Sequence, residues 1–155
     1  MSNFATIATM LHAVAAVIWV GGMFFAYVVL RPATGALEPP APLKLWVAVL
    51  PRFFPWVWAS VIILLLTGYA MVFGAFGGFA NAGYHVQVMH GSGLFMMVLF
   101  VYLFFVPYPR FLRAVQAEEW TRAAVNMGRI RRVVAINLTI GLLNVVVVGS
   151  GRFWP

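Results

Sequence analysis

The sequence has no cysteine and only three acidic residues, against ten lysines and arginines. The absence of cysteine excludes a disulfide framework, a thiolate-ligated zinc site and an iron–sulfur cluster held by cysteine. The three glutamates, Glu38, Glu118 and Glu119, all lie outside the long apolar runs of the chain. If these runs cross a membrane, no carboxylate lies inside it to serve in acid–base catalysis. This disfavours hydrolytic and proton-pumping chemistry.

Charge is scarce overall, because charged residues make up 8% of the 155 residues whereas hydrophobic residues make up 64%. A soluble domain of this size cannot bury so much apolar surface, so lipid is the expected solvent. Four apolar runs are long enough to cross a bilayer, namely residues 4–30, 54–76, 85–106 and 133–149. The sequence predicts one domain, residues 1–155, folded as an all-α bundle of four transmembrane helices, with a helical loop over residues 110–132.

The basic residues are distributed unevenly among the connections between these runs. Nine lie between the first and second runs or between the third and fourth, and only Arg152 lies on the other side. Since lysine and arginine concentrate in cytoplasmic loops, both termini are expected on the periplasmic side of a bacterial inner membrane. The net charge of +7 then indicates topology and contact with lipid headgroups, and nucleic acid is not an expected partner.

Only three histidines occur, His12, His85 and His90, and each falls inside or at the edge of a predicted span. An ionisable group is costly inside a membrane, so each histidine is a candidate functional residue. The first and third spans run in the same direction, which places His12 and His90 in the same leaflet, near the periplasmic surface. His85 and His90 point about 140° apart on their helix, so we do not expect them to ligate one ion together.

One hypothesis is that His12 and His90 are the axial ligands of a b-type haem held between the first and third spans. The protein would then serve electron transfer or membrane redox chemistry with a redox partner or a quinone. A porphyrin needs small neighbours, polar groups at its border and partners for its propionates. The candidates are Ala8, Ala15, Ala16, Gly91, Gly93, Gly141 and Asn144, with Tyr84, Asn81 and Arg152 near the propionates.

A second hypothesis is a copper-binding or copper-transporting protein, since imidazole and thioether groups both suit Cu(I). His85, Met89 and Met96 form a stripe that an ion could follow, and Met10 and Met71 could contribute from other helices. A third hypothesis is a non-catalytic packing subunit of a membrane complex, in which the histidines only form hydrogen bonds between helices. Catalysis and self-association stay open.

The run from Leu11 to Phe25 carries His12 and a Gly-Gly pair, and Leu30-Arg31-Pro32 follows it. This stretch resembles the first helix of the CopD-like family of bacterial membrane proteins, the copper resistance protein D group. The likeness continues through the tryptophan-rich start of the second span, the histidine-bearing start of the third, and Arg129-Ile130-Arg131-Arg132 ahead of the fourth. The resemblance implies an inner-membrane location and a link to copper handling.

A fainter similarity is to the HemJ-type membrane protoporphyrinogen oxidases, which also carry a histidine followed by a tryptophan in the first helix. By that resemblance His12 would be a haem ligand. Those proteins have a basic residue near the start of a later helix, where this chain has Gln87. The similarity therefore implies haem binding without implying HemJ-type catalysis.

Overall fold

The computed structural model describes residues 3–150, and every regular element within that range is a helix. Within residues 3–150, four helical units are long and apolar enough to span a membrane, which confirms the predicted all-α bundle. The first unit comprises α1 (Asn3–Phe24), the π-helix η1 (Phe25–Leu30), α2 (Arg31–Ala33) and the 3₁₀ helix η2 (Thr34–Ala36). The other three are α3 (Ala41–Gly74), α4 (Tyr84–Phe105) with α5 (Pro107–Gln116), and α6 (Trp120–Ser150).

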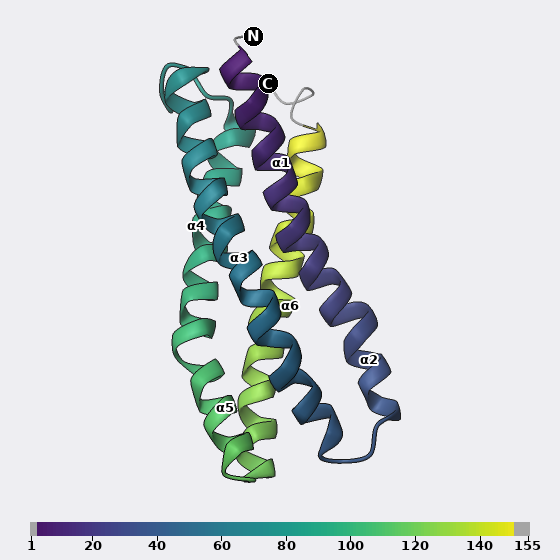
Figure 1. Ribbon diagram of the computed structural model, residues 1–155. Coiled ribbons are helices and arrows are strands. Elements are labelled where there is room, and N and C mark those ends of the chain that lie inside the picture. Colours follow the sequence, from purple (N-terminus) through teal and green to yellow (C-terminus); the bar gives the residue numbers. More distant parts are fainter. Residues whose placement is uncertain (1–2, 151–155) are drawn as a thin grey trace.

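The helices form one elongated bundle in which α1 lies between α3 and α6, and α6 lies between α1 and α4 (Figure 1). Large rings fill the remaining side, where Phe54 and Trp58 of α3 meet Phe100 of α4 with ring centroids 5.8 Å and 5.1 Å apart. The starts of α1 and α4 and the end of α6 lie together at one end of the bundle, which we call the terminal end. α2 and α5 lie toward the opposite end.

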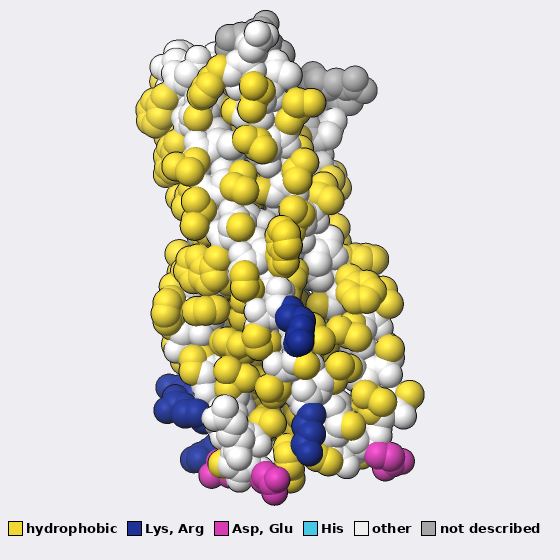
Figure 2. Space-filling view, viewed as in Figure 1, with side chains coloured by type: hydrophobic (Ala, Val, Ile, Leu, Met, Phe, Trp, Pro, Cys, Tyr) yellow, Lys and Arg dark blue, Asp and Glu magenta, His cyan; other side chains and the backbone are white. Residues whose placement is uncertain are grey.

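Charged side chains gather at the end that holds α2 and α5, and the surface above them is largely hydrophobic (Figure 2). We call this the charged end. Each of the four units exposes large apolar side chains, for example Val17 (70% exposed), Leu66 (68%), Val98 (65%) and Val146 (65%). An apolar surface of this extent is expected where lipid covers the protein.

The second span begins at Ala41, whereas the sequence predicts a transmembrane helix only from about residue 54. Pro51 and Pro55 indicate a helix start, because proline lacks the N–H group that a helix interior needs. In the structure both prolines lie inside α3. The helix continues through them because Trp46, Leu50, Phe54 and Val57 form one stripe of buried side chains on either side of the prolines.

The first span likewise continues past Arg31-Pro32, where the sequence predicts its end, and reaches Ala36 through α2 and η2. The N–H group of Arg31 donates to the carbonyl of Ala26, five residues earlier. This wider π-helical turn comes directly before Pro32, whose ring would clash with the carbonyl of a regular α-helical turn. The wide turn thus lets the chain pass the proline without a sharp break.

At the charged end, α3, α5 and the first half of α6 build a small three-helix core. Its centre is Phe111 of α5, which is fully buried. The predicted helical loop therefore does not stand apart from the fourth span, because α6 runs without interruption from Trp120 through the apolar run. The buried members of this core are Trp46, Leu50, Phe111, Ala114, Ala123, Met127 and Ile130.

Candidate functional site

His12 lies on the face of α1 that packs against α3. Its Nδ1 is 2.8 Å from the hydroxyl oxygen of Thr67. A Cβ atom added at Gly68 would lie 3.4 Å from Cε1 of the imidazole. Position 68 therefore lies against the imidazole ring, and Thr67 beside it anchors one ring nitrogen.

The hydrogen bonds around Thr67 determine which nitrogen of His12 carries the hydrogen. The Thr67 hydroxyl also lies 2.6 Å from the carbonyl oxygen of Ile63, to which it donates. A hydroxyl has one hydrogen, so toward His12 the Thr67 oxygen accepts and Nδ1 donates. Nε2 of His12 is then the nitrogen with a free lone pair. A histidine held through Nδ1 and free at Nε2 is the usual arrangement of a metal ligand.

A thioether lies about one helical turn from this imidazole, along the line of contact between α1 and α3, which we call the seam. Met71 follows Thr67 by four residues on α3, and its sulfur is 3.3 Å from the hydroxyl of Thr9 on α1. Thr9 in turn precedes His12 by three residues, so both pairs lie on the facing surfaces of α1 and α3. The seam therefore contains an imidazole and a thioether, both soft enough to bind Cu(I).

A second polar group lies between α4 and α6. Ser92 and Asn144 are 2.7 Å apart, and the Asn144 amide nitrogen is 3.9 Å from the sulfur of Met96. Asn137 donates to the carbonyl oxygen of Met96 at 3.0 Å. Asn137 is only 2% exposed, and its own carbonyl oxygen has no hydrogen-bond partner in the described part of the chain. Met96 is thus held at its backbone by one asparagine and contacted at its sulfur by another.

Gly141 allows α1, α4 and α6 to meet beside this group. A Cβ atom added there would lie 2.8 Å from a methyl carbon of Val20 and 3.3 Å from the terminal methyl of Met96. Asn137 and Gly141 are buried and Asn144 is half-buried. Their three- and four-residue spacing places these residues on one face of α6, and that face points into the bundle interior.

The other two histidines lie in different surroundings. The ring of His90 packs against Tyr69 of α3 and Phe79 of the loop that follows, with centroids 5.3 Å and 4.8 Å away. His85 folds back over Gly83, where an added Cβ atom would be 2.7 Å from its ring. Within residues 3–150, no hydrogen bond or ring contact joins His12 to His90, and the bis-histidine site stays a prediction.

The remaining candidates from the sequence are spread over both buried and exposed positions. Ala8 and Ala15 are buried, whereas Gly91 is exposed with no atom near enough to touch an added Cβ. Arg152 lies outside the described residues. Ala16, Gly93 and Met89 are half-buried, and Met10, Asn81 and Tyr84 are exposed.

No group of three or more histidine or carboxylate side chains that could hold a metal ion occurs in the described range. A site of the kind that zinc or a hard divalent cation prefers is therefore not formed by those side chains there. The donors that remain in the two polar groups are imidazole, thioether, amide and hydroxyl groups, all of them neutral. This set suits a soft monovalent cation better than a hard one.

Comparison with known protein families matches residues 47–150 to the model of the family described as copper resistance protein D. The match covers most of α3 and all of α4, α5 and α6, and it leaves His12 on α1 outside. No curated protein and no solved structure matches the chain. These comparisons do not show the fainter resemblance to the HemJ-type oxidases.

Proposed function

The chain belongs to the copper resistance protein D family, and we propose that it binds copper as Cu(I) between α1 and α3. The ion then moves to a second position between α4 and α6. The observation that carries this proposal is the hydrogen bond from Nδ1 of His12 to Thr67, which leaves Nε2 free to coordinate an ion. Met71 is the second donor on the same seam. Copper is the cargo here and is bound reversibly.

The choice of Cu(I) over a divalent ion follows from the charge of the donors. Imidazole, thioether and amide groups are neutral, and no carboxylate lies in the apolar runs to balance a second positive charge. Bringing an ion out of water into a low-dielectric interior costs more as its charge rises. A monovalent soft ion is therefore the one that this bundle accommodates best.

The polar group between α4 and α6, which contains Met96 and Asn144, supplies the next position for the ion. Met96 presents a sulfur beside Asn144, and the unpartnered carbonyl oxygen of Asn137 adds an oxygen donor deeper on the same face of α6. Conduction of an ion is favoured by several weak positions in sequence rather than by one tight site. We place the charged end in the cytoplasm, so His12 and Met71 are the positions nearer the periplasm.

The competing hypothesis is a b-type haem held by His12 and His90. In the structure His12 is held at Thr67, whereas His90 packs against Tyr69. Thr67 and Tyr69 are about 200° apart around α3, so the two imidazoles contact different sides of that helix. This arrangement supports two separate roles for the histidines better than one shared iron.

The test is a Cu(I) titration of the detergent-purified protein against a chromophoric Cu(I) chelator, together with its absorption spectrum. We expect the wild-type chain to bind Cu(I) and His12→Ala to bind it at least tenfold more weakly. His90→Ala is the matched control and should keep the wild-type affinity. Unchanged affinity in His12→Ala would overturn the proposal. A Soret band that both variants lose would establish the haem hypothesis instead.

A further inference from the structure

A groove runs between α5 and the first half of α6 at the charged end, well away from the histidines. Four arginines line it, Arg110 and Arg113 from α5 and Arg122 and Arg129 from α6. Its other lining residues are Ala114, Ala117, Glu119, Thr121, Val125 and Asn126. The groove therefore combines a small apolar floor with several guanidinium groups that converge from two helices.

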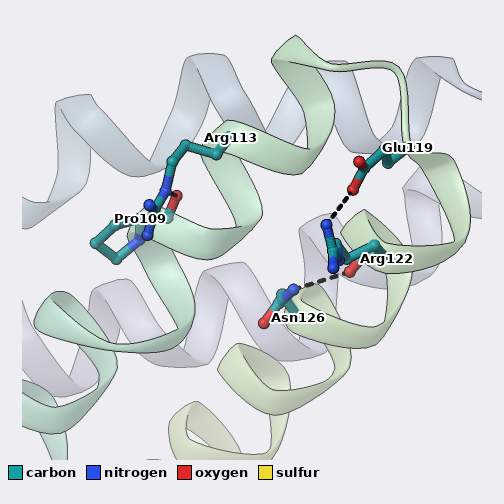
Figure 3. Close-up of polar contacts among 5 residues, drawn as sticks. All are labelled: Pro109, Arg113, Glu119, Arg122 and Asn126. Atoms are coloured by element: carbon teal, nitrogen blue, oxygen red, sulfur yellow. Dashed lines mark hydrogen bonds and ion pairs between the residues drawn. The ribbon is translucent and has the colours of Figure 1, made fainter.

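The charge of the groove is only partly neutralised. Glu119 is its one carboxylate, and it pairs with Arg122 at 2.7 Å (Figure 3). Arg113 donates through Nε to the carbonyl of Pro109. Among residues 3–150, no carboxylate lies within salt-bridge distance of Arg110, Arg113 or Arg129. Three guanidinium groups thus face one groove with no anion of the protein to pair with.

The groove also has an acceptor that lacks a donor. Asn126 is 4% exposed, and its amide nitrogen donates to the carbonyl of Arg122 at 2.9 Å (Figure 3). Its carbonyl oxygen is buried and has no hydrogen-bond partner in the part of the chain that the structure describes. A buried acceptor is normally satisfied by a hydrogen-bond donor, and a hydroxyl group fits that need.

The ligand that matches both features carries a phosphate and a hydroxyl group. We propose that the groove binds the headgroup of an anionic phospholipid of the phosphatidylglycerol type. Its phosphate would lie against Arg110, Arg113 and Arg129, because guanidinium groups bind phosphate through paired, charge-assisted hydrogen bonds. A headgroup hydroxyl donates to the carbonyl oxygen of Asn126, which requires the groove to open around this oxygen, because it is closed to solvent in the structure. This site lies beyond the proposed copper function and does not depend on it.

The depth of the groove favours a lipid over a soluble phosphate ester. Arg129 precedes Val133, where the apolar run of α6 begins, by four residues, and Arg110 follows Val106, at the end of the third run, by four. Both arginines therefore lie about 6 Å beyond the hydrocarbon boundary, which is the level of the lipid headgroups. Val125, an exposed apolar lining residue, offers a contact to the glycerol portion of a lipid.

The test measures lipid binding to the full-length, delipidated protein in detergent by native mass spectrometry. The probes are phosphatidylglycerol, phosphatidylmethanol of equal charge without a headgroup hydroxyl, phosphatidylcholine, and soluble glycerol 3-phosphate. The groove variant is Arg110→Gln/Arg113→Gln/Arg129→Gln. The control, Arg31→Gln/Arg52→Gln/Arg132→Gln, removes the same charge from residues that do not line the groove.

We expect the groove variant to bind phosphatidylglycerol at least tenfold more weakly, and the control to stay within threefold of wild type. Equal losses in both variants would overturn the proposal, because non-specific attraction would then explain the binding. Binding of glycerol 3-phosphate as tight as that of the lipid would identify a soluble phosphate ester and overturn the lipid assignment.

Asn126 is tested separately, so that the result does not depend on a triple variant that folds poorly. Asn126→Leu should lower the affinity for phosphatidylglycerol to that for phosphatidylmethanol, and leave the affinity for phosphatidylmethanol unchanged. If wild-type protein binds the two lipids equally, the hydroxyl contact is refuted. A loss of affinity for both lipids in Asn126→Leu would equally contradict the assigned role.

Discussion

His12 of α1 and Thr67 of α3 are joined by a 2.8 Å hydrogen bond although 55 residues separate them in the chain. Because the Thr67 hydroxyl gives its own hydrogen to Ile63, the bond fixes both the orientation and the tautomer of the imidazole. The pair thus supports one free ring nitrogen, Nε2 of His12.

Thr67→Val removes the acceptor but keeps the shape of the side chain. The Nδ1 hydrogen of His12 then has no partner, and the ring loses its fixed orientation. We expect the Cu(I) affinity to fall by about tenfold, the lower end of what loss of a supporting hydrogen bond costs a metal site. The measurement is competition with a Cu(I) chelator. Thr67→Ser keeps the hydroxyl and should retain wild-type affinity; a normal affinity in Thr67→Val would refute the role of the bond.

Met96→Leu separates the role of the sulfur from that of the side-chain volume. The two side chains are similar in size, so we expect the unfolding free energy to change by less than about 1.5 kcal/mol. Cu(I) flux into proteoliposomes should fall several-fold, because the thioether beside Asn144 is lost. Met97→Leu, at the next position on α4, is the control and should leave the flux unchanged. Equal fluxes in the two variants would exclude Met96 from the path.

Gly141→Ala tests the close approach of three helices. The added Cβ atom would lie 2.8 Å from Val20 and 3.3 Å from Met96, so these side chains or the helices have to move apart. We expect a loss of roughly 1–3 kcal/mol in stability, as for other overpacked positions, seen as a lower melting temperature in detergent. Gly91→Ala has open space around it and should be close to neutral. A neutral Gly141→Ala would mean that the helices are not packed this closely.

The absence of cysteine allows a direct test of topology. Ala75→Cys places a thiol in the loop at the terminal end, and Ala117→Cys places one at the charged end. Because the charged end carries the arginines, we expect it in the cytoplasm. A membrane-impermeant maleimide should label position 75 in intact cells and position 117 only after lysis. The reverse pattern would invert the predicted orientation.

Much of the bundle could be predicted because lipid exposure leaves a simple pattern. The four apolar runs identify the spans, and the helical spacing of Asn137, Gly141 and Asn144 matches the inward face of α6. The helix boundaries were harder to predict. Pro51 and Pro55 are local signals, and they are outweighed by a stripe of buried residues that packs into the core shared with α4, α5 and α6.

The contacts of the candidate site could not be predicted to the same degree. Thr67 is visible in the sequence as a polar residue in a span, and its bond to its own backbone is the expected one. Its second bond, to His12, depends on the register between α1 and α3, which no local pattern encodes. The same holds for His90, whose neighbours Tyr69 and Phe79 lie on a different helix and in a loop.

The four helical units contain 31 to 34 residues each. At 1.5 Å per residue they measure about 46–51 Å, whereas the hydrocarbon core of a bilayer is only about 30 Å thick. The excess is concentrated where Phe111 packs between α3 and α6. On that side the folded helices therefore extend through the layer of lipid headgroups. A protease or an antibody approaching from that side meets folded protein before it meets lipid.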